Sequence, residues 1–283
     1  MIPFDRIAIL VDGGFFLKRL PKVLGTTYDG SVDSTTKQLN RICRSHVEHL
    51  TGRPGLQSER SLWRRYVHRI LYYDAMPYDG KSQHPFSGKA IDFSTSDVAI
   101  FRREFFDSLR RQPKVALRLG TVVRDGDWRL SSKNSHRVLR TRALVSKLTV
   151  PNGADALQIS GDELRALQEI VDLWNSISLT EPSIAVRQKG VDMRLGLDIA
   201  SIAYKRLATT IVLVTGDSDF VPAAKLARRE GLEIILDPLW QQIGPELFEH
   251  IDGLRSGLPR PNREELPEQK AASDDVVSQS PEP

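Results

Sequence analysis

Five aspartates in three separate segments are the residues whose type and spacing point most clearly to chemistry. Asp12 follows an apolar run at residues 7–11, Asp217 and Asp219 follow a strand-like segment at residues 210–215, and Asp192 and Asp198 lie within KGVDMRLGLD. Gathered acids repel one another, and a hard divalent cation with oxygen ligands, Mg²⁺ or Mn²⁺, offsets that repulsion. Such ions activate water and stabilise the leaving oxygen in phosphodiester hydrolysis.

The segments that carry these acids belong to an alternation of strands and helices. The apolar patterns predict five strands, at residues 6–11, 66–74, 114–122, 210–215 and 232–236, and helices near residues 37–50, 97–111, 191–207 and 219–230. Such alternation is typical of parallel βαβ construction. We therefore predict an α/β fold with an open, mainly parallel five-stranded sheet, flanked by helices on both faces and carrying insertions.

The predicted sheet would bring these acids to one edge. Ligands of open parallel sheets sit outside the carboxyl ends of the strands, where Asp12 and Asp217 are expected, each beside a glycine that permits a sharp turn. Asp198 lies on a helix between Leu195 and Ile202, both expected to face the core. Its carboxylate should therefore be paired with a cation or hydrogen bonded.

Each acid also has a purely structural interpretation. Asp192 could be only the N-cap of its helix, Ser218 or Asp219 only the cap of the helix at 219–230, and Asp12 only a turn former. Delivery of acids by three segments to one edge favours a shared site. Three other acids that follow predicted strands are left out of this site: Asp74, Asp79 and Asp237. Of these, Asp74 is the one most easily added to it.

The charge of the chain is unevenly distributed. The formal net charge is +4, but residues 102–147 hold thirteen Lys or Arg against four acids, a net of +9. This basic stretch could be a solvated face or could guide the backbone of a nucleic acid. Trp128 within it could stack on a base or belong to the core.

Residues 1–260 are expected to form one domain with insertions near 25–62 and 124–183, the second holding a hairpin at Asp125-Gly126 and a helix near 162–177. Residues 261–283 read as a disordered, acidic, proline-rich tail. The N-terminus lacks the apolar region of a signal peptide, and the apolar runs are strand-sized, so we expect a cytoplasmic protein without a membrane partner. The single cysteine, Cys43, is expected in the core.

Three motifs resemble the NYN domain, a PIN-like family, in its LabA-like bacterial branch: ILVDGGF at 9–15, KGVDMRLGLDIASIA at 189–203 and IVLVTGDSDFVPAAKLARREG at 211–231. YYDAMP at 72–77 is similar to the second strand of that family, and the resemblance spans residues 7 to about 237. It implies metal-dependent ribonuclease activity, with Asp12, Asp192, Asp217 and Asp219 as metal ligands and Asp198 as a further acid. Many members carry an Asn shortly after the first Asp, where this chain has Phe15 and Phe16. This difference bears on a substrate contact that the Asn would make, and it removes no metal ligand.

The first hypothesis is therefore an Mg²⁺- or Mn²⁺-dependent endoribonuclease. Its catalytic acids would be Asp12, Asp192, Asp198, Asp217 and Asp219, and its substrate contacts Gly13, Lys189, Thr215 and Ser218. Rival hypotheses are a DNA nuclease of the same chemistry and a non-catalytic RNA-binding regulator. A phosphatase or nucleotidase is disfavoured because no nucleophile loop or Walker-type glycine loop is present. The oligomeric state is left open, with a homodimer among the options.

Overall fold

The computed structural model describes residues 6–53, 62–146, 148 and 160–261, and these form two compact units. The first unit comprises the chain up to Asp74, residues 104–119 and the chain from Gly190 onward. The second comprises residues 75–103 and 120–189. The predicted tail, apart from its first residue, and residues 54–61 of the first predicted insertion lie outside the described residues.

The sheet has the strand order β6-β5-β2-β1-β7-β8-β9. Parallel pairing joins β1 to β2 and β7, β7 to β8, and β8 to β9, whereas β5 and β6 are antiparallel. The mainly parallel α/β class and all five predicted strands are confirmed, and the sheet has two strands more. The strands are β1 (Ile7–Asp12), β2 (Val67–Ala75), β5 (Val115–Arg129), β6 (Ser183–Lys189), β7 (Thr210–Val214), β8 (Glu233–Asp237) and β9 (Gly253–Leu254).

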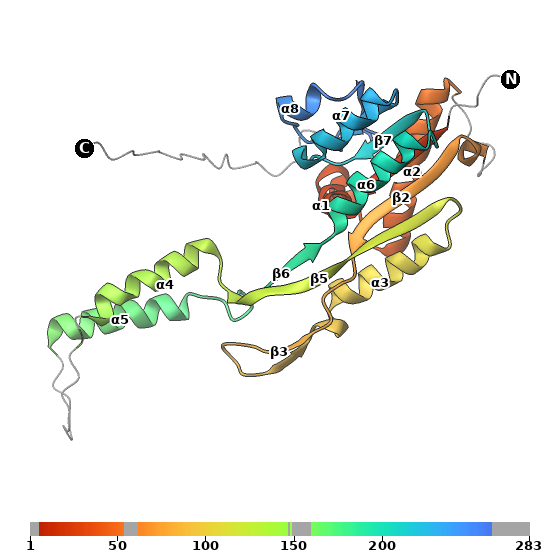
Figure 1. Ribbon diagram of the computed structural model, residues 1–283. Helices are drawn as coiled ribbons and strands as arrows, with labels where there is room; N and C mark the ends of the chain where they lie inside the picture. Colours follow the sequence, from red (N-terminus) through yellow and green to blue (C-terminus); the bar gives the residue numbers. More distant parts are fainter. Residues whose placement is uncertain (1–5, 54–61, 147, 149–159, 262–283) are drawn as a thin grey trace, which may run out of the picture. The chain divides into compact units, whose positions relative to one another are not determined.

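Helices cover both faces of the sheet in the first unit (Figure 1). Right-handed crossovers account for this arrangement, because the step from β1 to β2 and the step from β7 to β8 run in opposite directions across the sheet. The α1 and α2 helices therefore lie on one face, while α6 and α7, which pack on each other, lie on the other. The helices are α1 (Gly13–Leu24), α2 (Val32–Thr51), α6 (Val191–Tyr204), α7 (Val221–Arg229) and α8 (Pro245–Phe248).

The two central strands, β1 and β7, are apolar on both faces and form the middle of the core. Residues 8–11 and 211–214 have no exposed surface, as expected for strands covered by helices on each side. Burial of one such aliphatic side chain contributes roughly 1.5–3 kcal/mol. Cys43 of α2 is fully buried, as predicted, and burial raises the pKa of its thiol to about 12.

The second unit contains β6, most of β5, a short hairpin and two helices that pack together. The hairpin strands are β3 (Lys81–Gln83) and β4 (Ala90–Asp92), and the helices are α4 (Ser132–Val145) and α5 (Gly161–Asn175). The helix predicted near 162–177 is thus confirmed. The α3 helix (Asp97–Arg110) begins in this unit and continues into the first from Glu104.

The hairpin predicted at Asp125-Gly126 is wrong. The β5 strand runs through these residues and pairs with β6, with a shift of register between Arg124 and Trp128. Gly126 has φ of 109°, a conformation that suits a bulge as well as a turn, so the dipeptide alone did not distinguish the two. Trp128 packs against His84 and Phe93, at ring-centroid distances of 5.5 and 6.2 Å, which favours the packing interpretation of this residue over base stacking.

None of the helices in the described part of the chain is long and apolar enough to cross a membrane.

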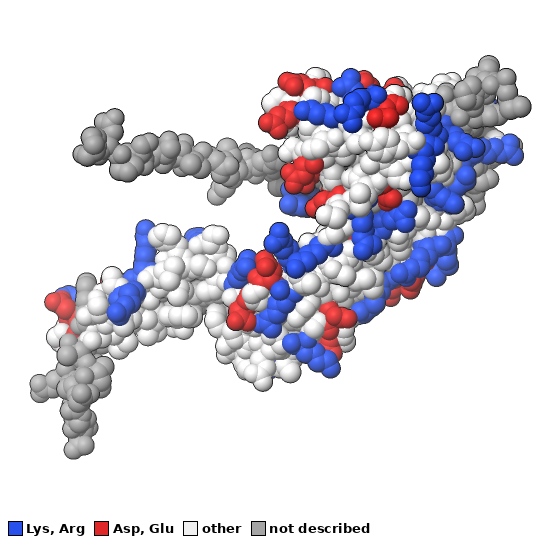
Figure 2. All heavy atoms as spheres, viewed as in Figure 1, with Lys and Arg blue, Asp and Glu red and all other residues white. Residues whose placement is uncertain are grey.

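Charged side chains are unevenly spread over the first unit. In the view of Figure 2, Lys and Arg side chains gather over β2, whereas acidic and basic side chains alternate over α7 and α8.

Candidate functional site

Asp12 stands at the junction of β1 and α1. One carboxylate oxygen, Oδ1, accepts a hydrogen bond of 3.0 Å from the backbone N–H of Phe15 and so caps α1. The other oxygen, Oδ2, accepts one of 3.2 Å from the hydroxyl of Thr215. Burial raises the pKa of Asp12, and the negative charges of Asp192 and Asp74 act in the same direction, against these two hydrogen bonds.

Thr215 connects the acid of β1 with the acids that follow β7. Its side chain is fully buried, and its hydroxyl accepts a hydrogen bond of 3.2 Å from the backbone N–H of Asp217 while it donates to Asp12. The parallel register, in which Val11 lies opposite Val214, places these residues side by side at the carboxyl ends of the two strands. Sheet register and one buried hydroxyl thus set the spacing of Asp12 and Asp217.

Asp217 precedes a short 3₁₀ helix, η4 (Ser218–Phe220), and Asp219 lies within it. Oδ1 of Asp217 accepts a hydrogen bond of 3.0 Å from the backbone N–H of Asp219. Both side chains and that of Ser218 are exposed. Asp217, rather than Ser218 or Asp219, therefore caps this helix, and Asp12 caps α1, each through its Oδ1. The Oδ2 of Asp12 accepts from Thr215 instead.

Asp192 is an exposed residue in the first turn of α6 and does not cap that helix. The N-cap is Gly190, and no side chain bonds to the helix end there. Partial burial raises the pKa of Asp192, and the charges of Asp217 and Asp219 raise it further. Because these carboxylates influence one another electrostatically, acids from α6 and from the end of β7 lie in one region of the first unit.

Asp198 has partners of its own. Its Oδ2 accepts hydrogen bonds from the hydroxyl of the buried Tyr73 at 2.9 Å and from Nε of Arg118 at 2.8 Å. The expectation that this carboxylate would be paired is confirmed, and the partners are Tyr73 and Arg118. Burial raises the pKa of Tyr73 well above its usual range, and the nearby charge of Asp198 adds to this, so Tyr73 remains a donor.

Two acids left out of the predicted site have defined places in the structure. Asp74 is fully buried at the end of β2, and its negative charge contributes to the raised pKa of Asp12. Its position after a strand next to β1 was the signal that could have included it. Asp237 is also fully buried, and it accepts hydrogen bonds from His46 of α2 and from the backbone N–H groups of Leu239 and Gly257. It organises the loop after β8.

The four predicted substrate contacts differ in their surroundings. Gly13 is buried, and a Cβ there would lie 2.6 Å from the Tyr72 ring and from the carbonyl oxygen of Tyr73. Thr215 is buried between Asp12 and the backbone of Asp217. Ser218 is exposed and lines a cleft. Lys189 is exposed at the end of β6, in the second unit.

A cleft of about 460 Å³ is lined by both acidic and basic side chains, and we call it the acidic cleft. Asp12 and Asp217 contribute the carboxylates, and α1 contributes Lys18, Arg19 and Lys22, which sequence reasoning missed. Lys18 and Lys22 are exposed and one helical turn apart. The remaining lining residues are Gly14, Phe15, Gly216, Ser218 and Gln241.

The basic stretch at 102–147 is divided between the two units, and several of its arginines are engaged within the fold. Arg118 bonds to Asp198, Arg110 to Asp107 and Arg124 to Asp127.

Within the described residues, no group of three or more His, Cys, Asp or Glu side chains is arranged to hold a metal ion.

Comparison with known proteins gives one family. The NYN domain model matches residues 131–246. The predicted resemblance to the NYN family is thereby confirmed for residues 131–246. The NYN match contains Asp192, Asp198, Asp217 and Asp219, but Asp12 lies before it. It begins inside the second predicted insertion, so that it includes α4 and α5. An NYN domain indicates a nuclease-like function.

The crystal structure of a protein of unknown function from Vibrio parahaemolyticus is similar to this chain with 12% sequence identity and a TM-score of 0.40, over 90% of this chain and 94% of that chain. The search of the curated proteins gave no match.

Proposed function

We propose that this protein is an endoribonuclease that hydrolyses RNA phosphodiester bonds with the help of Mg²⁺ or Mn²⁺. The observation that carries the proposal is the hydrogen-bonded connection from Asp12 through Thr215 to Asp217, in a cleft that Lys18, Arg19 and Lys22 also line. Carboxylates and cations that line the same cleft suit a phosphodiester together with a divalent ion.

The donor set fits a hard divalent ion. Asp12 and Asp217 offer only oxygen ligands, and Mg²⁺ in phosphoryl-transfer sites is commonly held by one or two carboxylates, with water and substrate phosphate as the remaining ligands. The two acids are therefore sufficient protein ligands, with Asp192 and Asp219 as further ligands. Such an ion supplies an activated water and offsets charge on the phosphate oxygens.

Electrostatics favours the same assignment. Burial and neighbouring carboxylates raise the pKa of Asp12, and partial burial with the charges of Asp217 and Asp219 raises that of Asp192. Unpaired negative charges in this region therefore destabilise the protein, and a bound cation would relieve the repulsion. Asp198 is a positioning residue in this account, since Arg118 and Tyr73 occupy its carboxylate.

The α1 helix would bind the substrate backbone. Exposed Lys18 and Lys22 can donate to successive phosphate oxygens, whereas Arg19 donates to the carbonyl oxygen of Leu239 at 2.8 Å and holds the loop after β8. Gly13, Lys189 and Ser218 remain predicted substrate contacts. A DNA nuclease of the same chemistry and a non-catalytic RNA-binding regulator are the alternatives that the experiment must separate. We place the activity in the cytoplasm.

The test is a cleavage assay of the purified full chain on labelled single- and double-stranded RNA and DNA, with Mn²⁺, Mg²⁺ or EDTA. Asp217→Asn is the inactive variant and Asp33→Asn, at an exposed position of α2, is the matched control. The proposal expects RNA cleavage that EDTA and Asp217→Asn abolish and that Asp33→Asn retains. Preferential cleavage of DNA would establish the first alternative, and RNA binding without metal-dependent cleavage the second. Equal cleavage by wild type and Asp217→Asn would assign the activity to a contaminant.

A further inference from the structure

A second, strongly basic depression lies along α2. Two pockets of about 340 and 670 Å³ share Arg41 and Arg44 as lining residues, and we call them together the α2 groove. Their volumes are those of ordinary ligand sites, about 300–1,000 Å³. The only carboxylate among the lining residues is Glu48, and the lining cations are Lys37, Arg41, Arg44, Arg64 and Arg255.

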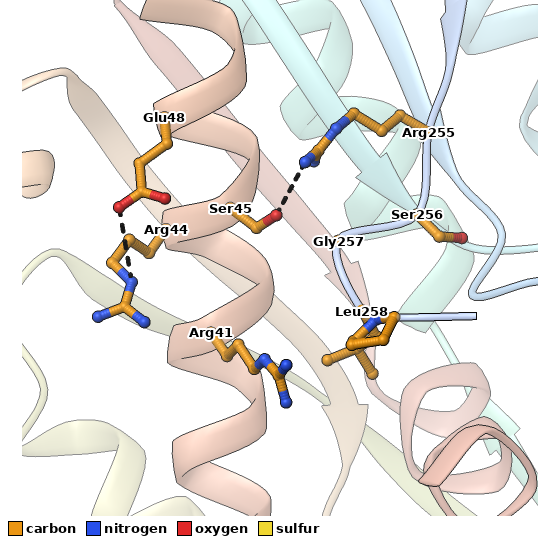
Figure 3. A pocket seen from close by; sticks show the side chains of 9 residues that line it. Arg41, Arg44, Ser45, Glu48, Arg255, Ser256, Gly257 and Leu258 are labelled. Carbon is orange, nitrogen blue, oxygen red and sulfur yellow. Dashed lines mark hydrogen bonds and ion pairs between the residues drawn. The ribbon is translucent and has the colours of Figure 1, made fainter. Parts of the chain in front are cut away.

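The cations come from both sides of the groove. Lys37, Arg41 and Arg44 recur at helical spacing and therefore share one side of α2. Arg255, from the segment after β9, reaches across and donates to the hydroxyl of Ser45 at 3.0 Å, and Arg41 extends toward the same segment (Figure 3). Glu48 lies 3.9 Å from Arg44 and offsets only a part of this charge.

Two of these arginines have buried nitrogens that lack an acceptor. Within the described part of the chain, neither Nη1 of Arg255 nor Nε of Arg64 has a hydrogen-bond partner, although both atoms are shielded from solvent. Among the lining acceptors, Oε1 of Gln38 and Oε1 of Glu48 are also buried without a hydrogen bond, and the cations still outnumber the one carboxylate. A buried charged donor without an acceptor is costly, and a merely solvated basic face would not bury its donors. Such an arrangement suits an anion with several oxygens, and a phosphate group has the required charge and acceptors.

The α2 groove is connected to the acidic cleft through the loop after β8. Gln241 of this loop lines the acidic cleft. The preceding residue, Trp240, donates from its backbone to Ser256 at 3.0 Å and from its indole Nε1 to the carbonyl oxygen of Leu258 at 2.9 Å. Ser256 and Leu258 line the α2 groove. One aromatic residue therefore stands between the two sites.

The backbone of this loop is held in an unfavourable conformation. Leu239 and Trp240 have φ of 46° and 62°, in the left-handed region that side chains other than glycine seldom adopt. Asp237 and Arg19 fix it, through bonds of 2.9 Å to the N–H and 2.8 Å to the carbonyl oxygen of Leu239. Trp240 nevertheless remains 42% exposed, with Arg260 over its ring at 5.8 Å. Strain maintained around an exposed aromatic side chain is characteristic of a binding loop.

We propose that the α2 groove binds backbone phosphates of the nucleic-acid strand whose scissile bond lies in the acidic cleft, and that Trp240 stacks on a base between the two sites. This inference rests on the proposed function. It assigns the strand a path from α1 over the loop after β8 to α2. Stacking on one aromatic residue with phosphate contacts on either side is the common design of single-strand binding surfaces.

The test measures binding without cleavage. Fluorescence anisotropy with a labelled single-stranded RNA of about 16 nucleotides is recorded in EDTA at several salt concentrations, for the full chain, Arg41→Gln/Arg44→Gln and Trp240→Ala. Lys225→Gln/Arg229→Gln removes as many charges from exposed positions of α7 and is the matched control. Lys37→Gln/Arg41→Gln, at exposed positions of α2, is the second variant should the first fail to fold.

The proposal expects about tenfold weaker RNA binding by Arg41→Gln/Arg44→Gln and a salt slope that is smaller by about 1.4, from two lost phosphate contacts. Trp240→Ala should weaken binding about tenfold, and the α7 control should bind like wild type. Wild-type affinity of both α2 variants, or an equal loss in the α7 control, would overturn the proposal. Equally tight binding of UMP or inorganic phosphate, lost in the same variants, would assign the groove to a small phosphate and overturn the strand path.

A second measurement separates this inference from the proposed function. Wild type in EDTA should bind the RNA with this dependence on Arg41 and Arg44, whether or not it cleaves RNA with Mg²⁺ or Mn²⁺. If that binding persists while no metal-dependent cleavage is found, the proposed function fails and the groove remains. If cleavage of a dinucleotide and of the long RNA is equally unaffected by Arg41→Gln/Arg44→Gln, the groove fails and the proposed function remains.

Discussion

The hydroxyl of Thr215 lies 3.2 Å from Oδ2 of Asp12 and donates a hydrogen bond to it. Because the same hydroxyl accepts from the backbone N–H of Asp217, one buried side chain orients two acids that are 205 positions apart in the sequence. Thr215 is thus a positioning residue in the proposed site, and its substitution tests whether the spacing of Asp12 and Asp217 matters.

Thr215→Val should lower kcat for RNA cleavage about tenfold to a hundredfold, in the range expected when a group that orients ligands is lost. It should also lower the free energy of unfolding by about 1–3 kcal/mol, because buried polar groups lose their partner. Thr215→Ser keeps the hydroxyl and should restore kcat. Steady-state kinetics and urea unfolding of both variants provide the check. A valine variant with wild-type kcat would contradict the positioning role.

Gly13→Ala and Gly14→Ala form a matched pair at the start of α1. A Cβ at Gly13 would lie 2.6 Å from the carbonyl oxygen of Tyr73, whereas at Gly14 the nearest atom is Asp12 Oδ1 at 3.5 Å. Gly13→Ala should therefore destabilise the protein by about 1–3 kcal/mol, and Gly14→Ala should be neutral or stabilising by up to about 1 kcal/mol. Thermal unfolding distinguishes them. Equal stability of the two variants would show that the close contact of a Cβ at Gly13 with the carbonyl oxygen of Tyr73 does not destabilise the protein.

The raised pKa of Asp12 predicts a definite dependence of stability on pH. Burial, the largest cause, and the charges of Asp192 and Asp74 raise it above the ordinary value of 3.8, so the folded state holds this proton more tightly than the unfolded state. The corresponding stability is present below pH 3.8 and is lost as pH rises through the folded pKa. Wild type should therefore lose stability relative to Asp12→Asn as pH rises above 3.8 in EDTA.

Urea unfolding of both proteins across this range measures the difference directly. Mg²⁺ or Mn²⁺ at neutral pH should raise the stability of wild type and have little effect on Asp12→Asn. If the stability of wild type instead rose relative to that of Asp12→Asn as pH increased, the hydrogen bonds to Asp12 would lower its pKa more than burial raises it, which would contradict this prediction.

The pair formed by His46 and Asp237 holds α2 to the end of β8. His46 Nε2 and Asp237 Oδ2 lie 2.8 Å apart, both side chains are fully buried, and Asp237 also accepts from Leu239 and Gly257. Asp237→Asn should destabilise the protein by about 2–4 kcal/mol because a buried network loses partners. Urea unfolding beside exposed Asp33→Asn, expected within about 0.5 kcal/mol of wild type, checks this. A similarly small effect at Asp237 would contradict it.

Apolar periodicity was sufficient to predict the central strands. Runs such as residues 7–11 and 211–214 are apolar at every position, as expected of a short strand covered on both faces. The pattern was insufficient for α1, where Gly13, Gly14 and Pro21 weaken the helical signal and the cap at Asp12 becomes visible only in three dimensions. The β6 strand and the bulge at Gly126 could not be predicted either, because both depend on the pairing of β5 with β6. A strand at the edge of a sheet has little apolar periodicity.

The acids at the ends of β1 and β7 could be chosen from the sequence, since parallel strands deliver their carboxyl ends to one edge. The surroundings of these acids could not. The engagement of Asp198 by Arg118, the influence of Asp74 on Asp12 and the cations of α1 in the acidic cleft all depend on contacts between distant segments. Sequence spacing gives candidates for a site, and tertiary contacts decide which of their oxygens are available.

The most direct test of the central claim, that Asp12 and Asp217 act on one divalent ion, is a double-mutant cycle in metal-dependent RNA cleavage. We predict that Asp12→Asn, Asp217→Asn and the double variant lose kcat to the same extent, because either substitution removes the shared ion. Losses that multiply in the double variant, or a single variant that retains wild-type kcat, would contradict the account.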